Sequence, residues 1–209
     1  MAYAKQGLLG EFKGRLGNTV IYEVYGKTRI RLKPSVKPPP ATGAKKQAQE
    51  DFKLVMSLMQ ATKAFVRIGF YDQAEGRSAF HEGLSFNLNS YRQAENKDIG
   101  AWLQLSNGQR AGAQNLAIQR EGKKAIVSWG APEPGKVAAG DDAVLLLALN
   151  TCNFDCNWVL SKYQRSQQQA EIILPPLKEA EECLVFVAFR KQYSTKKQPI
   201  NMSVSQVVK

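Results

Sequence analysis

Ala143-Val-Leu-Leu-Leu-Ala-Leu-Asn150 and Cys183-Leu-Val-Phe-Val-Ala-Phe-Arg190 are the two stretches that decide the fold. Each is a short, unbroken apolar run that is bounded by polar or turn residues. Such runs are too short for a typical helix, and the Val and Phe content of the second is typical of a strand buried on both faces. We therefore expect the two stretches to lie together in the middle of a β domain.

Short strands separated by turn residues are predicted throughout the second half of the chain, from Ala101 onward. A regular series of this kind, without helices between the strands, is typical of an antiparallel sandwich of the immunoglobulin-like or fibronectin-III-like type. Trp129 is expected to fill space between the two sheets. The predicted strands cover residues 102–105, 116–119, 125–129, 143–149, 158–163, 170–174, 184–189 and 202–208.

A β-hairpin is predicted in the first part of the chain. Residues 19–25 and 28–32 are β-prone runs on either side of a two-residue turn, Gly26-Lys27. A Gly-X pair at this position matches the twist of the two strands. Before the hairpin, glycines at 7, 10, 14 and 17 predict tight bends.

A row of cations is predicted along one face of the second hairpin strand. Alternation places Arg29, Arg31 and Lys33 on the same face, about 6.6–6.8 Å apart. With the adjoining Lys27 and Lys37, this row could follow the phosphate backbone of a nucleic acid. Alternatively it is a solvated strand face, since lysine also protects edge strands from aggregation.

Aromatic residues lie beside this row. Tyr22 or Tyr25 could assist nucleic-acid binding by stacking on bases. Both tyrosines could equally be packing residues.

Two helices are predicted after the hairpin. Residues 34–41 contain four prolines and are expected to form an extended connector. Apolar residues then recur at helical spacing from Ala44 to about Ile68, which predicts one helix ended by Gly69. A second helix is expected between Asp72 and Tyr91, where Asp72 and Glu75 have the spacing of a capping box.

These elements together predict an α+β protein with two parts. Residues 1–98 hold the glycine-rich segment, the basic hairpin and the helical pair, and residues 99–209 hold the sandwich. The two parts could share a core, because a hairpin and two helices have little else on which to bury their apolar faces.

The chain is basic. Its net charge is +11, and residues 1–41 carry eight Lys or Arg against Glu11 and Glu23. Such an excess favours anionic partners, namely nucleic acid, anionic lipid or an acidic protein, although a solvated surface is the alternative. No apolar run approaches the roughly 20 residues of a membrane span, and no secretory signal is seen, so a cytoplasmic location is expected.

Residues that could perform chemistry are few. Cys152 and Cys156 have no second Cys pair or His to complete a zinc site, and Cys183 is expected in the core. His81 is the only histidine and is expected at the surface, and Asp141-Asp142 is expected in a solvated loop. We therefore expect no cofactor, no metal and no catalytic residue, and predict that the protein is not an enzyme.

The sequence also resembles a family of uncharacterised proteins found mainly in Bacteroidetes and classed as a domain of unknown function. The resemblance covers essentially the whole chain, but it departs at Lys45 and Gln49, where the family has Gln and Arg. It implies the fold and no activity. The matching residues are Gly7-Leu8-Leu9-Gly10, Gly14-Arg15-Leu16-Gly17-Asn18, Tyr22, Gly26-Lys27, Arg31, Pro34, Thr42, Phe52, Ser85-Phe86-Asn87-Leu88, Leu105-Ser106-Asn107-Gly108 and Ser128-Trp129.

The sequence favours a non-catalytic binding or assembly module that associates with itself or with another protein. Sandwiches of this type mostly present surfaces, and the sequence offers no reactive group. Two alternatives stay open. One is a nucleic-acid-binding protein that uses the basic hairpin, and the other is a structural component of a phage or other mobile element.

Overall fold

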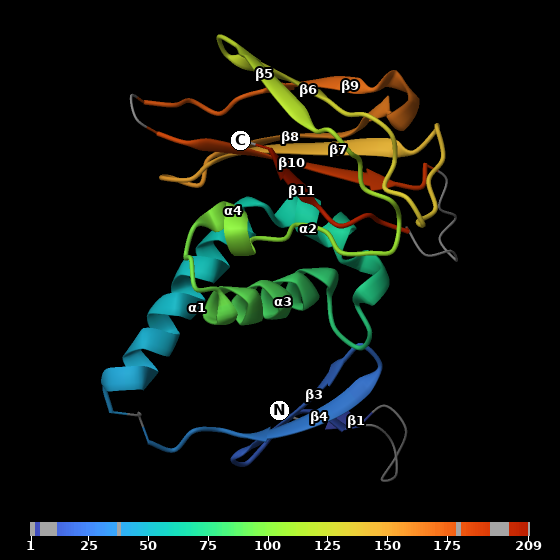
Figure 1. The fold of residues 1–209 in the computed structure, drawn as a ribbon. Coiled ribbons are helices and arrows are strands. Elements are labelled where there is room, and N and C mark those ends of the chain that lie inside the picture. The colour runs from blue at the N-terminus through green and yellow to red at the C-terminus, as the bar shows by residue number, and fades with distance from the viewer. Residues whose placement is uncertain (1–2, 5–11, 37–38, 179–180, 193–200, 209) are drawn as a thin grey trace. The chain divides into compact units, whose positions relative to one another are not determined.

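The protein is described by a computed structural model that covers residues 3–4, 12–36, 39–178, 181–192 and 201–208 (Figure 1). It is a mixed α+β protein with three antiparallel sheets. The chain forms two compact units, Met1–Gln47 and Ala48–Lys209. The division into residues 1–98 and 99–209 stays a prediction.

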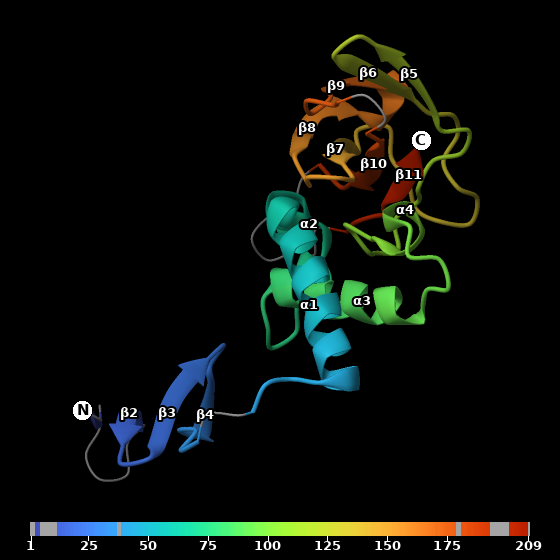
Figure 2. The same ribbon diagram turned by 90° about the vertical axis from the view of Figure 1, so that its left-hand side faces the viewer.

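The first unit contains one antiparallel sheet, called here the N-terminal sheet. Its strands lie in the order β1-β2-β3-β4, and Figure 2 shows β2, β3 and β4 side by side. Of the glycines predicted to form tight bends, Gly14 lies in β2 and Gly17 (φ 58°) lies in the turn between β2 and β3, whereas Gly7 and Gly10 lie outside the described residues. The strands are β1 Tyr3–Ala4, β2 Phe12–Leu16, β3 Thr19–Val24 and β4 Lys27–Leu32.

The predicted hairpin is confirmed, but its turn lies one residue earlier than expected. Val24 pairs with Lys27, so that Tyr25 and Gly26 form the turn in place of Gly26 and Lys27. Tyr25 (φ 51°) and Gly26 (φ 73°) both have positive φ, as a type I′ turn requires. The pairing register moves by two residues, so every side chain keeps the face that alternation predicts.

Four helices lie between residues 43 and 102, after the N-terminal sheet. The single helix predicted for residues 44–68 is interrupted at Thr62, where the carbonyl of Leu58 accepts both from the hydroxyl (3.0 Å) and from the N–H (3.1 Å) of Thr62. The helix ends at Gly69 as predicted. The helices are α1 Gly43–Ala61, α2 Lys63–Gly69, α3 Ala79–Gln93 and α4 Ile99–Trp102.

The predicted capping box at the start of the second helix is wrong. Asp72 lies in a 3₁₀ turn, η1 Tyr71–Gln73, and its carboxylate accepts a hydrogen bond from the backbone N–H of Asn201. Helix α3 instead begins after Ser78, whose hydroxyl accepts from the N–H of His81 (3.2 Å). The glycine within the predicted first turn, Gly76 (φ 67°), has a left-handed backbone conformation, which does not fit the interior of a right-handed helix.

Two further sheets make up the strand-rich part of the second unit. They have the strand orders β5-β6-β9 and β11-β10-β7-β8. Most predicted strands are confirmed, but residues 102–105 hold the end of α4 and not a strand. The strands are β5 Ala117–Glu121, β6 Lys124–Ser128, β7 Ala143–Asn150, β8 Cys156–Gln164, β9 Gln169–Ile173, β10 Cys183–Arg190 and β11 Gln206–Val208, with a 3₁₀ turn, η2 Arg165–Gln167, after β8.

The four-stranded sheet is the middle layer of the second unit, with the helices on one side and the three-stranded sheet on the other (Figure 1). Leu145 and Leu147 of β7 pack with the helices, whereas Val144 and Leu146 pack with β6 and β9. Strands β7 and β10 are paired along their whole length and are almost completely buried, as the two apolar runs predict. The helices and the strands therefore share a core.

Candidate functional site

The two faces of the N-terminal sheet differ sharply in chemistry. Side chains that are directly opposite in neighbouring strands share a face, so the register decides which residues meet. Arg15, Val20 and Arg31 form one row across β2, β3 and β4, and Tyr22 is opposite Arg29 on the same face. Leu16, Thr19 and Leu32 form a row on the other face. One face is thus cationic and the other is apolar.

The cationic face consists of Arg15, Lys27, Arg29, Arg31 and Lys33. All five side chains are exposed, and none forms an ion pair with a residue that the structure describes. The structure thus brings together four of the five cations predicted for nucleic-acid binding and adds Arg15. The fifth, Lys37, lies outside the described residues.

Tyr22 lies within the cationic face. Its ring is partly exposed, and the guanidinium carbon of Arg31 lies 5.8 Å from the ring centroid. This distance is within the range of a cation–π interaction. Tyr25, the other predicted stacking residue, is exposed in the turn at the end of the same hairpin.

The apolar face carries Leu16, Ile21, Ile30 and Leu32, and Thr19 and Thr28 share it. Three of these side chains are well exposed, Leu16 by 65%, Ile30 by 68% and Leu32 by 76%. Glu23 lies at the margin of this face and forms an ion pair with Lys13. Large apolar residues that are this exposed and adjacent usually mark an interaction surface.

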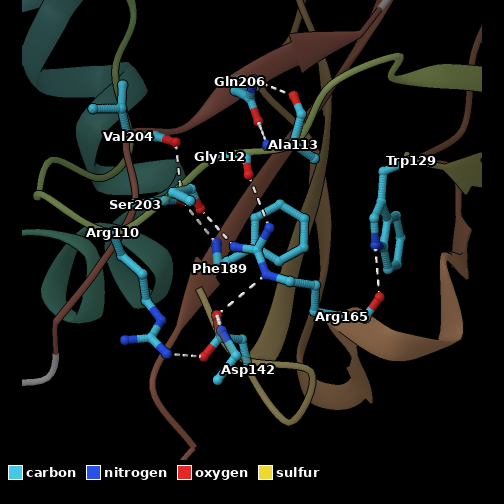
Figure 3. A network of polar contacts seen from close by, with 12 residues as sticks. Arg110, Gly112, Ala113, Trp129, Asp142, Arg165, Phe189, Ser203, Val204 and Gln206 are labelled. Atoms are coloured by element: carbon cyan, nitrogen blue, oxygen red, sulfur yellow. Dashed lines mark hydrogen bonds and ion pairs between the residues drawn. The ribbon is translucent and has the colours of Figure 1, made fainter. Parts of the chain in front are cut away.

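A buried ionic cluster lies inside the second unit (Figure 3). Oδ1 of Asp142 accepts a hydrogen bond from Arg110. Oδ2 accepts from Nε of Arg165 (3.2 Å) and from the N–H of Ala139 (3.0 Å). Asp142 is fully buried, so the expectation of a solvated loop is wrong for this residue, although Asp141 is exposed. Two guanidinium groups and a backbone N–H thus hold both carboxylate oxygens inside the protein.

Arg165 connects this cluster to the core. Its guanidinium donates to the carbonyls of Gly112 (2.8 Å) and Ala111 (2.5 Å), and lies 3.7 Å from the ring centroid of Phe189. Trp129, buried between the sheets as predicted, donates from Nε1 to the carbonyl of Arg165 (2.9 Å). Desolvation by burial lowers the pKa of Arg165, and Asp142 opposes this effect. These contacts indicate a structural role.

The residues considered for chemistry differ in their surroundings. His81 is exposed and its Nδ1 is 2.7 Å from the hydroxyl of Ser78, while Cys183 is buried in the core as predicted. Cys152 is exposed, and Cys156 lies 3.2 Å from the carbonyl of Ala61. The described part of the chain contains no group of three His, Cys, Asp or Glu side chains that could hold a metal ion.

One hollow of about 570 Å³ lies among α3, α4 and β11. No titratable side chain is among the described residues that line it. Its described walls are apolar or neutral, so they provide no charged group. The lining residues include Phe86, Ser90, Gln93, Trp102, Gln104 and Ser205.

The sequence analysis did not identify Arg15 as part of the cationic face, or Arg110 and Arg165 as part of the buried ionic cluster. Arg15 could have been found, because Lys13 and Arg15 alternate with Gly14 and Leu16 as in a strand. Arg110 and Arg165 could not, since 32 and 23 residues separate them from Asp142.

Among the helices that the structure describes, none combines the length and the apolar character that a membrane span requires. No curated protein matches the chain. The family described as "Family of unknown function (DUF6266)" matches residues 11–203, which is nearly the whole sequence, and the chain therefore belongs to this family.

Proposed function

We propose that the protein is a non-catalytic assembly module that associates with a second copy of itself through the apolar face of the N-terminal sheet. The observation that carries this proposal is the exposure of Leu16, Ile30 and Leu32 on one face of this sheet. A sheet with an apolar face needs a second layer to bury that face. The described residues of the first unit provide no such layer.

A second copy is a suitable partner because the face is chemically self-complementary. Two such faces can stack about 10 Å apart, as sheets do in sandwiches. The five cations all lie on the opposite face, so stacking would leave them in water and would not bring like charges together.

The non-catalytic part of the proposal is supported by the positions of the reactive groups. Among the described residues, His81, Asp142 and the three cysteines form no group of three that could hold a metal ion, and Asp142 is paired with Arg110 and Arg165. The prediction that the protein is not an enzyme stays a prediction. A role as a structural component of a phage or other mobile element is compatible with an assembly module.

We also infer that the two facing sheets of the second unit are related to the immunoglobulin-like and fibronectin-III-like sandwiches. The first, second and fifth of their strands form the sheet β5-β6-β9. The third, fourth, sixth and seventh form the sheet β8-β7-β10-β11. In sandwiches of seven strands, this division arises when the fourth strand pairs with the sheet that holds the third, sixth and seventh strands. The helical layer is an addition to such a sandwich.

The experiment is size-exclusion chromatography with light scattering on the full chain over a wide range of concentrations. The unmodified protein is expected to form dimers that dissociate on dilution. The double variant Ile30→Thr/Leu32→Thr places β-branched residues, which suit a strand, at both positions and removes most of the apolar surface, so it is expected to be monomeric. The control is Val137→Thr/Ile173→Thr, which changes similarly exposed residues of the second unit and should still dimerise.

Two results would contradict the proposal. One is an unmodified protein that stays monomeric at every concentration. The other is a double variant that associates as strongly as the unmodified protein. If the protein is monomeric and the double variant is only less stable, another part of the same chain covers the apolar face.

A further inference from the structure

We propose that the cationic face of the N-terminal sheet binds single-stranded nucleic acid. This interaction would use the face opposite to the one proposed for assembly, and neither proposal requires the other. The argument rests on the arrangement of five cations, on the excess of arginine among them and on the position of Tyr22 between them.

The cations form a continuous surface that fits a polyanion. Lys27, Arg29, Arg31 and Lys33 follow one another at every second residue, so the row is about 20 Å long. Arg15 lies two strands away from Arg31, which widens the surface by about 10 Å. No acidic side chain is placed on this face by the register of β2, β3 and β4. Such a surface complements the regular negative charge of a phosphate backbone.

Three of the five cations are arginines, which suit phosphate better than lysines do. The planar guanidinium group can donate two parallel hydrogen bonds to one phosphate, whereas the ammonium group of lysine acts as a point charge. Arginine planes also stack on nucleic-acid bases. The composition of the face therefore favours a ligand with both phosphates and exposed bases.

Tyr22 provides the aromatic surface that an unpaired base needs. It is opposite Arg29, it contacts Arg31, and its neighbours in β3 on the same face are Val20 and Val24. Bases stack on aromatic side chains in this way where proteins bind single strands on an open sheet. A solvated strand face has no need of an aromatic ring that lies beside a guanidinium group.

The width of the sheet disfavours a duplex as the ligand. A two-stranded ribbon can enter the major groove, which is about 12 Å wide. Here β2 lies beside the hairpin, so the axes of three strands already span about 10 Å before their side chains are counted. The cationic face is therefore too wide to lie flat in a groove, whereas a single strand can lie across it.

The test is fluorescence anisotropy with the full chain and a labelled single-stranded oligonucleotide of mixed sequence, about 12 nucleotides long. Five phosphate contacts would give a slope of log K against log salt of about −3.5, so affinity should fall roughly 100-fold between about 50 mM and about 200 mM salt. A duplex of the same length should bind at least about fivefold more weakly, because its bases cannot stack on Tyr22.

Charge variants locate the surface. Arg29→Gln/Arg31→Gln removes two phosphate contacts, so the salt slope should become shallower by about 1.4. The control Lys53→Gln/Arg67→Gln removes the same charge from exposed positions of α1 and α2 and should leave both affinity and slope nearly unchanged.

The stacking role of Tyr22 has its own signature. Tyr22→Leu should weaken binding of the single strand about fivefold or more without changing the salt slope, because no charge is lost. Tyr22→Phe keeps the ring and should retain most of the affinity. Circular dichroism checks that each variant keeps its fold.

Several results would overturn the proposal. Absence of binding at about 50 mM salt would do so, as would equal loss of affinity in the Lys53/Arg67 control. Equal or tighter binding of the duplex, with Tyr22→Leu behaving as the unmodified protein, would exclude a single strand as the ligand. Tight binding to vesicles containing anionic lipid, with no competition by the oligonucleotide, would assign the face to a membrane surface instead.

Discussion

Asp142 and Arg165 form a buried ion pair in which the Nε–Oδ2 distance is 3.2 Å and both side chains are almost inaccessible to water. The backbone N–H of Arg165 also donates to the carbonyl of Asp142 (2.8 Å). This pair joins the start of β7 to the turn after β8, and Arg110 adds the segment before β5. The cluster connects three parts of the chain that are distant in sequence.

Replacement of Asp142 by Asn should strongly destabilise the second unit. Asp142→Asn removes the negative charge and leaves two buried guanidinium groups without a counter-charge, an effect that typically costs about 3–5 kcal/mol. Urea denaturation followed by circular dichroism would measure it. Asp141→Asn is the matched control because Asp141 is exposed, and it should change the unfolding free energy by less than about 0.5 kcal/mol. Equal stabilities of the two variants would contradict a structural role for the cluster.

A side chain at Gly69 should destabilise the contact between α2 and the segment that follows α4. A Cβ atom at this position would lie 2.2 Å from the carbonyl oxygen of Leu105 and 2.7 Å from Cα of Ser106, both backbone atoms that cannot turn aside. Gly69→Ala is therefore expected to cost about 1–3 kcal/mol, measured as a lower melting temperature. Gly140→Ala should be nearly neutral, because its Cβ would meet only Ser166 at 3.6 Å. A neutral Gly69→Ala would show that the two segments can separate freely.

Loss of the Asn87 side chain should leave backbone groups unpaired. Asn87 is fully buried in α3, where its Nδ2 donates to the carbonyl of Gln104 (2.7 Å) and its Oδ1 accepts from the N–H of Gln104 (2.7 Å). Asn87→Ala is expected to lower the unfolding free energy by about 2 kcal/mol or more. Asn89→Ala, at an exposed position of the same helix, should not destabilise the protein. Denaturation curves that coincide for the two variants would refute the bridging role of Asn87.

Stability should decline in alkaline solution partly because of Cys183. Burial raises the pKa of the Cys183 thiol above its ordinary value of 9.0, so the folded protein keeps this proton at a pH where the unfolded chain has lost it. The stabilising contribution is therefore complete below about pH 9 and is lost as pH rises through the folded pKa.

The measurement compares urea midpoints of the unmodified protein and Cys183→Val at about pH 8 and about pH 10. The valine variant should lose less stability over this interval, by an amount that cannot exceed about 1.4 kcal/mol per pH unit for one proton. Cys152→Ser, which changes an exposed thiol, should decline as the unmodified protein does. A parallel decline in all three proteins would mean that Cys183 does not contribute.

Much of the local structure could be predicted from the sequence. The apolar runs at 143–150 and 183–190 form central strands buried on both faces, and strict alternation correctly assigns Arg29 and Arg31 to one face of the hairpin and Ile30 and Leu32 to the other. These features depend on the period of a strand and on short turns, which neighbouring residues determine. Even the one-residue error in the turn left the faces unchanged.

The composition of the clusters and layers was decided only by the tertiary structure. The sequence suggested a shared core, but it did not indicate which side chains of β7 and β10 the helices cover. Nor did it indicate that Arg15 lies in line with Arg31, or that Asp142 meets Arg110 and Arg165. Each of these relationships joins segments that are distant in sequence or depends on strand register. Alternation determines which side chains share a face, but only the packing of distant elements determines what that face contacts and which charges become buried.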